Sequence, residues 1–223
     1  MRRRSLLAAA VACAAGPAFG REPVDVALVL ATDASGSIDD DEFRLQKEGI
    51  AEAIADPRVL AAIASQPIGR STFAYLEWGS PGAPSLIVPW TVIAGAADAA
   101  CFGEAIMRAP RSLQSWNAIG DAIVLATDLL RDCPFEATRG VIDVAGDGPD
   151  MRSLTPASRA RDAAVREGYV INALAIVLRP AARGLVDHYA RDVIGGPGAF
   201  VEVAEGRGDF VTALRRKLLR EIA

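Results

Sequence analysis

Apolar runs of strand length alternate with longer segments of helical periodicity along most of the chain. Residues 24–32 are almost continuously apolar, which is typical of a strand buried on both faces of a parallel sheet. We expect further strands at residues 71–78, 85–90, 139–145, 169–178 and 200–203. We expect helices from about 39 to 64 and over 96–108, 118–131, 156–167, 181–190 and 210–222.

Repeated alternation of strands and helices defines the expected fold class. It predicts an α/β fold in which a doubly wound, mainly parallel sheet carries helices on both faces. Residues 80–84, Ser-Pro-Gly-Ala-Pro, have the chemistry of a turn, so the strand that follows them should return as a hairpin. Asp39 and Glu42 fit a helix capping box, although Gly49 and Pro57 could interrupt the helix that follows.

Two acidic residues follow the ends of expected central strands. Asp33 comes directly after the apolar run 24–32, and Asp147 lies in a Gly-Asp-Gly turn after strand 139–145. In sheets of this class ligands bind beyond the carboxyl ends of the strands, so both acids should meet at one edge if their strands are neighbours. Asp143, about 13 Å lower in the same strand, is expected instead to meet a buried partner such as an arginine.

The segment around Asp33 offers oxygen atoms at alternating positions. Asp33, Ser35 and Ser37 form an Asp-x-Ser-x-Ser motif on the turn that leaves the strand. Hard divalent cations such as Mg²⁺ take oxygen ligands of this kind. The other reading is that Ser37 caps a helix and Asp147 forms a turn without any metal.

These motifs in their strand contexts resemble the von Willebrand factor type A domain and its metal-ion-dependent adhesion site. Residues 141–148 and 193–200 also look like a bacterial family of exported type A-like proteins of unassigned function. The resemblance spans nearly all of residues 21–223. It implies a six-stranded sheet ordered 3-2-1-4-5-6 with one antiparallel strand, and a divalent cation whose open position accepts a carboxylate from a partner protein.

Carried over by position, the resemblance implies a ligand set. Its members are Asp33, Ser35, Ser37, Asn117 and Asp147. Asn117 stands where the family has a threonine before an Ile-Gly pair; an amide oxygen can coordinate a hard cation, but on a longer arm. Ser115 is a nearby substitute for it. Trp116, beside this loop, is either an aromatic of a partner-binding rim or a core residue.

The first twenty residues predict an export signal. Arg2, Arg3 and Arg4 precede a short apolar segment, and small residues follow at 18–20. Without this segment the chain has 21 basic and 28 acidic residues, which argues against nucleic acid or an anionic membrane surface as a partner. No later stretch is apolar for long enough to span a membrane. We therefore expect residues 21–223 to form one domain in the periplasm or outside a bacterial cell.

Two cysteines remain after the expected signal, Cys101 and Cys133. In an oxidising compartment an even pair suggests a disulfide, and two separate buried thiols are the alternative.

Taken together, the sequence predicts an exported protein-binding domain that holds Mg²⁺, or alternatively Mn²⁺ or Ca²⁺, and uses it to engage an acidic residue of another protein. A metal-free interaction scaffold is the second reading and a metal-assisted hydrolase the third. Catalysis is disfavoured because His188, the single histidine, is expected on a helix surface and no Gly-x-Ser-x-Gly nucleophile motif occurs. Trp90 is either a second rim aromatic or a core residue, and Glu77 is expected to be a solvated charge.

Overall fold

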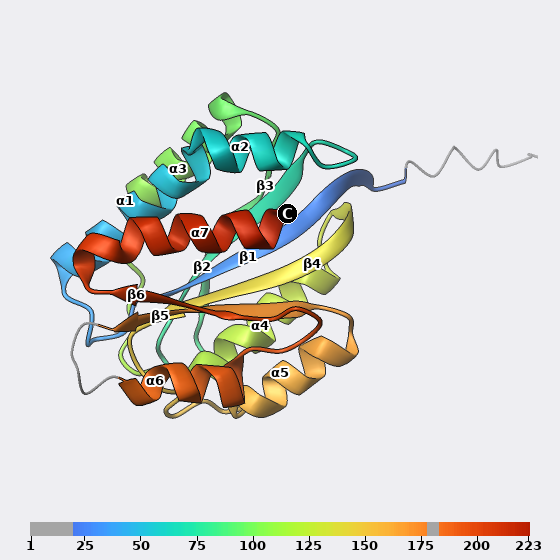
Figure 1. Ribbon diagram of the computed structural model, residues 1–223. Helices are drawn as coiled ribbons and strands as arrows, with labels where there is room; N and C mark the ends of the chain where they lie inside the picture. The colour runs from blue at the N-terminus through green and yellow to red at the C-terminus, as the bar shows by residue number, and fades with distance from the viewer. Residues whose placement is uncertain (1–19, 178–182) are drawn as a thin grey trace, which may run out of the picture.

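A six-stranded sheet runs through the molecule in the order β3-β2-β1-β4-β5-β6 (Figure 1). The structure is a computed structural model that describes residues 20–177 and 183–223. The expected signal at residues 1–20 lies outside the described residues except for Gly20. The strands are β1 (Glu22–Asp33), β2 (Ser71–Trp78), β3 (Ser85–Ile93), β4 (Phe135–Gly146), β5 (Val170–Val177) and β6 (Val201–Glu205). Only β3 pairs antiparallel, through the β2–β3 hairpin, so the predicted sheet is confirmed.

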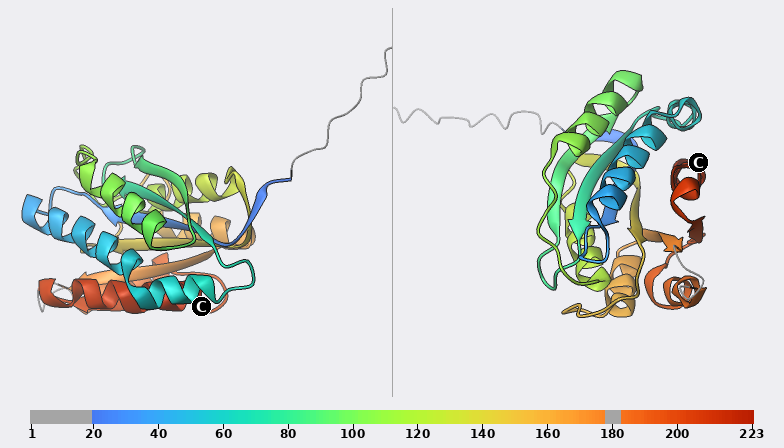
Figure 2. Two further views of the ribbon diagram at one scale, coloured as in Figure 1. Left: turned by 90° about the horizontal axis from the view of Figure 1, so that it is seen from above. Right: turned by 90° about the vertical axis from the view of Figure 1, so that its left-hand side faces the viewer.

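Helices cover both faces of the sheet (Figure 2). One layer holds α1 (Asp40–Ala55), α2 (Pro57–Ala64), α3 (Ala96–Arg108) and α7 (Phe210–Ile222). The other holds α4 (Ile119–Arg131), α5 (Ala157–Arg166) and α6 (Arg183–His188). Each layer packs on its own apolar cluster, which is the arrangement that strands buried on both faces require.

Local sequence sets several of these boundaries. The Asp39 side chain accepts from the Glu42 amide and Glu42 reaches back to the Asp39 amide, which is the capping box expected at the start of α1. The expected helix 39–64 breaks at Asp56, because Pro57 cannot continue α1 and instead begins α2. Of the helix expected at 181–190, residues 181 and 182 lie outside the described residues; the rest is observed as α6, followed by a short π-helix over Tyr189–Val193.

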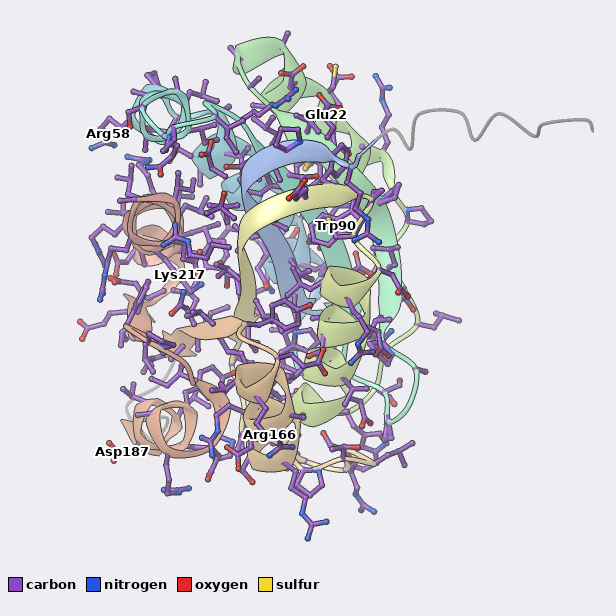
Figure 3. All side chains as sticks on the ribbon, turned by 90° about the vertical axis from the view of Figure 1, so that its right-hand side faces the viewer. Glu22, Arg58, Trp90, Arg166, Asp187 and Lys217 are labelled. Carbon is purple, nitrogen blue, oxygen red and sulfur yellow. The ribbon has the colours of Figure 1, made fainter. Side chains whose placement is uncertain are left out.

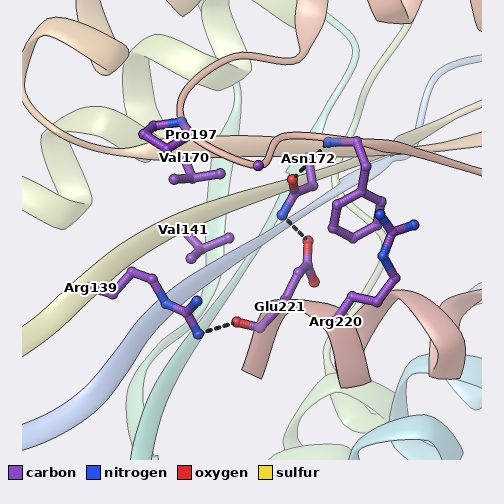
Figure 4. Close-up of a pocket in the computed structure, with 9 residues that line it drawn as sticks. Arg139, Val141, Val170, Asn172, Pro197, Arg220 and Glu221 are labelled. Carbon is purple, nitrogen blue, oxygen red and sulfur yellow. Dashed lines mark hydrogen bonds between the residues drawn. The ribbon is translucent and has the colours of Figure 1, made fainter. Parts of the chain in front are cut away.

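A buried charge cluster joins α7 to the sheet at Asp143, which lies level with Leu30 of β1. The Lys217 ammonium lies 2.7 Å from Asp143 Oδ2 and also contacts Glu221, and all three residues are buried (Figure 3). The buried partner of Asp143 is therefore a lysine rather than an arginine. Asn172 donates to Glu221 Oε1 at 3.0 Å beside the pocket drawn in Figure 4. Burial, reinforced by the nearby Asp143 charge, raises the pKa of Glu221 from 4.5 to about 8.

The expected disulfide does not form in the structure. Cys101 is exposed on α3, whereas Cys133 is buried in the apolar cluster on the opposite face of the sheet. Both are free thiols, because their elements pack on different sides of the molecule. The alternative of two separate thiols holds, although only Cys133 is buried.

No helix among the described residues combines the length and the apolar character that crossing a membrane requires.

Replacing Glu221 with glutamine should flatten the pH dependence of stability. The folded-state pKa of Glu221 lies above its ordinary value, so the stability from this group is full below about pH 4.5 and is lost as the pH rises through about 8. We expect the unfolding free energy of the wild type to fall more than that of Glu221→Gln between about pH 6 and about pH 9. Urea unfolding at each pH measures both, with the exposed Glu136→Gln as the control. Parallel curves for all three proteins would contradict this assignment.

Candidate metal centre

The strand register brings the two predicted acids to one edge of the sheet. Thr32 of β1 pairs with Ala145 of β4, so Asp33 lies level with Gly146, and Asp147 follows one residue later. On its other side Asp33 pairs with Trp78, the last residue of β2. The central strands thus end together beneath a set of loops, which is where ligands bind in sheets of this class.

The Asp-x-Ser-x-Ser turn folds into a connected set of oxygens. The Ser35 amide donates to Asp33 Oδ1 at 2.8 Å, and the Ser35 and Ser37 hydroxyls lie 3.0 Å apart. Ser37 then donates to Asp147 Oδ1 at 3.1 Å, across 110 residues of sequence. The structure therefore brings Asp33, Ser35, Ser37 and Asp147 into one cup.

Asn117 lies against the same loop. Its side chain is buried, and a Cβ placed on Gly148 would lie only 2.2 Å from Asn117 Nδ2, so Gly148 is the residue that leaves room for this amide. The Asn117 carbonyl accepts from the Met151 amide, which ties the two loops together. Asn117 is thus adjacent to the turn that carries Asp147. Ser115, the other candidate in this loop, exchanges hydrogen bonds with Ser80 instead.

Two oxygens in this region are buried and have no hydrogen-bond donor. They are Asp33 Oδ2 and Asn117 Oδ1. A buried polar oxygen without a partner costs about 1–3 kcal/mol, and a bound cation would remove that cost. Together with the Ser35, Ser37 and Asp147 oxygens, these carboxylate and amide oxygens are of the kind that a hard divalent cation takes.

The electrostatics favour a cation for the same reason. Burial raises the pKa of Asp33 to about 7, opposed by hydrogen bonds from Ser35 and reinforced by the Asp147 charge. Burial likewise raises the pKa of Asp147. Negative charge is therefore costly in the cup, and a bound cation would offset that cost. Within the described residues no three Asp, Glu, His or Cys side chains gather as a metal site; the cup has two carboxylates, and its other side-chain oxygens are hydroxyls.

Arg111 holds the backbone of the cup from outside. One guanidinium nitrogen donates to the Ala34, Ser35 and Ile38 carbonyls at 2.8 to 3.1 Å. The guanidinium also stacks 4.7 Å from the Phe43 ring. The sequence gives no sign of this contact, because about 75 residues separate the arginine from the carbonyls.

Two acids, the buried Asp121 and the half-buried Asp150, fix the neighbouring loops. Asp121 accepts from the amides of Gly82, Leu154 and Thr155, and Asp150 accepts from those of Gly120 and Ala157. The hydroxyl of Tyr189, the first residue of the π-helix, donates to the Gly148 carbonyl at 3.2 Å. Apart from the bond between Asp150 and Ala157, these contacts join elements that are distant in sequence, and they were not foreseen.

The expectation for Glu77 is corrected, and the structure decides between the two alternatives left open for Trp90 and Trp116. Glu77 is buried rather than solvated, and its carboxylate accepts from the Ser112 amide at 2.7 Å. Trp90 packs on the α4 side of the sheet and donates to the Leu129 carbonyl, so it is a packing residue and not part of a rim. Trp116 is 46% exposed and remains available at the rim.

His188 is also placed differently from the expectation of a surface residue. Its imidazole is only 17% exposed, accepts from the Asp150 amide through Nε2 and lies 2.9 Å from Asp192 through Nδ1. It supports the loop after β4.

The sheet order, the antiparallel β3 and the helical layers define the von Willebrand factor type A fold, and solved structures agree. The pilus adhesin SpaC from Lactobacillus rhamnosus GG matches with a TM-score of 0.63 at 13% identity, covering 89% of this chain and 30% of that one. The vWF domain of the type V pili tip protein Mfa5 from Porphyromonas gingivalis matches with a TM-score of 0.60 at 11% identity, covering 89% and 95%. Proximal thread matrix protein 1 from the mussel byssus, solved with a zinc-occupied MIDAS motif, gives 0.58 at 14% identity, covering 89% and 46%.

Residues 23–223 match the family described as "Protein of unknown function (DUF1194)", and the chain belongs to that family. No curated protein matches the sequence. The chain spans less than half the length of SpaC and of the mussel protein. At these identities the structural matches establish the fold alone.

Replacing Arg111 with methionine should destabilise the domain by about 2–4 kcal/mol, because three carbonyls lose a charged donor and the cup backbone loses its support. Urea unfolding of this variant and of Arg108→Met measures the effect. Arg108 is exposed and pairs only with Glu104 one helical turn away, so its loss should cost less than about 1 kcal/mol. Equal destabilisation by the two substitutions would contradict the role given to Arg111.

Proposed function

We propose that this chain is a protein-binding domain whose binding depends on a divalent cation. The ion is Mg²⁺, with Mn²⁺ or Ca²⁺ as alternatives, and it engages a carboxylate of a partner protein. The proposed ligands are Asp33, Ser35, Ser37, Asn117 and Asp147.

The observation that carries this proposal is the pair of buried oxygens without donors. Asp33 Oδ2 belongs to the cup with its two serine hydroxyls and second carboxylate, and Asn117 Oδ1 comes from the neighbouring loop that packs against Gly148. A cation satisfies all of them at once, whereas a single water has at most two protons to donate.

The burial of the cup assigns different tasks to its residues. Asp33, Ser35 and Asn117 are buried and would hold the ion from below. Ser37 is exposed and Asp147 half-buried, so they would stand at the mouth, where a partner can approach. When bound, the ion supplies a Lewis-acidic position for a carboxylate oxygen, and Mg²⁺ usually keeps water at such a position until a ligand replaces it.

A metal-free scaffold is the second candidate. It is favoured by the hydrogen bonds among Ser35, Ser37 and Asp147, which satisfy part of the cup without a cation. It leaves the Asp33 and Asn117 oxygens unexplained. Hydrolysis is the weaker alternative, because His188 is occupied with the Asp150 amide and Asp192.

The proposal places the protein outside the bacterial cytoplasm. Its support is the signal-like pattern of residues 1–20, with its arginines, short apolar segment and small residues. The fold shared with SpaC and Mfa5 is compatible with a role in contacts between proteins.

Calorimetric titration of Mg²⁺ and Mn²⁺ into the chelator-treated domain, residues 21–223, tests the site. We expect saturable one-to-one binding, weakened by about tenfold or more in Asp147→Ala and in Asp33→Asn. Asp187→Ala, an exposed acid on α6, is the matched control and should bind as the wild type does.

Circular dichroism should show all four proteins folded. Equal affinity in the wild type and both site variants would contradict the ligand assignment. Wild-type protein that binds neither ion at several millimolar would favour the metal-free scaffold.

A further inference from the structure

Exposed apolar side chains gather on the two loops beside the cup. Leu113 and Trp116 lie on the loop before α4, and Met151 and Leu154 lie on the loop after β4. Their exposed fractions are 97%, 46%, 44% and 75%. We call these four residues the apolar rim. Apolar side chains clustered beside a polar site are typical of surfaces that contact another molecule.

Hydrogen bonds connect the rim directly to the cup. The Met151 amide donates to the carbonyl of Asn117, one of the proposed ligands, and Trp116 precedes Asn117 in the chain. Asp121 binds the Leu154 amide at 3.0 Å. The rim therefore stands on a fixed backbone, which lowers the entropy lost when a partner binds.

Arg152 adds a positive charge within the rim. Its guanidinium lies 4.8 Å from the centre of the Trp116 ring, and the residue is exposed. Within residues 20–177 and 183–223 no carboxylate forms an ion pair with it. Arg111, beside the cup, pairs instead with Asp40.

The backbone of Arg152 is strained. It has a φ of 71°, the one positive value among the non-glycine residues that the structure describes. A left-handed conformation costs such a residue roughly 1–2 kcal/mol. Glycine would adopt it without this cost, so the arginine side chain at this turn needs a separate reason.

We propose that the apolar rim and Arg152 select the partner of the metal site. The occupant is a protein segment that presents one carboxylate to the ion, a second carboxylate to Arg152 and an apolar side chain to Trp116 and Met151. This inference rests on the proposed function, and it adds which residues must flank the metal-bound acid. Charge complementarity supports this occupant, because Arg152 carries a positive charge beside the cup and has no ion pair with any described residue.

A lipid surface is the other class of macromolecule that exposed leucines and a tryptophan could contact. The chain has a formal net charge of −4, and the cup itself is acidic. Anionic headgroups would be repelled by both, and one arginine does little to offset them. A protein segment is therefore favoured.

An array of immobilised peptides tests the inference. Each peptide carries a fixed central aspartate with varied flanking residues, and binding of the domain is measured in Mg²⁺ and in EDTA. We expect Mg²⁺-dependent binding to peptides with a second acid and a leucine, isoleucine or phenylalanine. Arg152→Gly, which also relieves the backbone strain, should weaken binding to these diacid peptides by about three- to tenfold. Trp116→Ser should remove the apolar preference.

Both variants should keep the wild-type affinity for Mg²⁺ in calorimetry, because neither residue supplies a ligand. Arg159→Ala, an exposed arginine on α5, controls for the loss of one positive charge and should bind peptides as the wild type does.

The outcomes separate this inference from the proposed function. Mg²⁺ binding with no flank preference, or with the same preference in Arg152→Gly, overturns the role of the rim alone. Wild-type protein that binds no Mg²⁺ overturns the proposed function and this inference with it. Rim-dependent binding to vesicles of phosphatidylglycerol and phosphatidylethanolamine, with none to peptides, also overturns it.

Discussion

Parallel pairing of β1 with β4 is the constraint on which the candidate site depends. The pairing runs from Glu22 to Thr32 of β1, so the two strands reach the same edge within one residue of each other. β2 pairs on the other side and ends there too, opposite Asp33. Because β1 is buried on both faces from Val24 onward, its register cannot slip without moving apolar side chains out of the two clusters. The position of Asp33 relative to Asp147 is therefore set by the core.

Two acidic sites at different depths of the sheet show how differently the fold treats buried charge. Asp143 lies within β4 and meets the Lys217 ammonium, so the protein supplies its counter-charge. Asp33 ends β1 and accepts from the Ser35 amide at Oδ1, and its second oxygen has no donor. Removing the buried counter-ion Lys217 would leave the charge of Asp143 unpaired and would be costly for stability. The free oxygen of Asp33 lies at the edge of the sheet instead, where an ion from solution could reach it. This contrast separates a structural charge from a candidate functional one.

The sequence was informative wherever local chemistry decides the outcome. Apolar runs predicted the strands, the Asp39 and Glu42 pair predicted the start of α1, and the acids after β1 and β4 predicted the edge where they meet. Contacts between distant segments could not be predicted from the sequence. They are the hydrogen bonds of Arg111 to the cup carbonyls, those of Asp121 to three amides, and the ion pair of Lys217 with Asp143. The predicted disulfide was wrong, because the number of cysteines and the expected compartment do not indicate on which face of the sheet each cysteine lies. Glu77 and His188 were misjudged for a similar reason, since their partners come from other elements.

The most direct test of a cation in this cup is the anomalous scattering of a crystal of the domain soaked in Mn²⁺. The account predicts one strong peak within bonding distance of Asn117 Oδ1, the Ser35 and Ser37 hydroxyls, and either Asp33 Oδ2 or a water bound to it. A crystal of Asp147→Ala should show no such peak. A well-ordered cup in which water alone lies among these oxygens, at millimolar Mn²⁺, would contradict it.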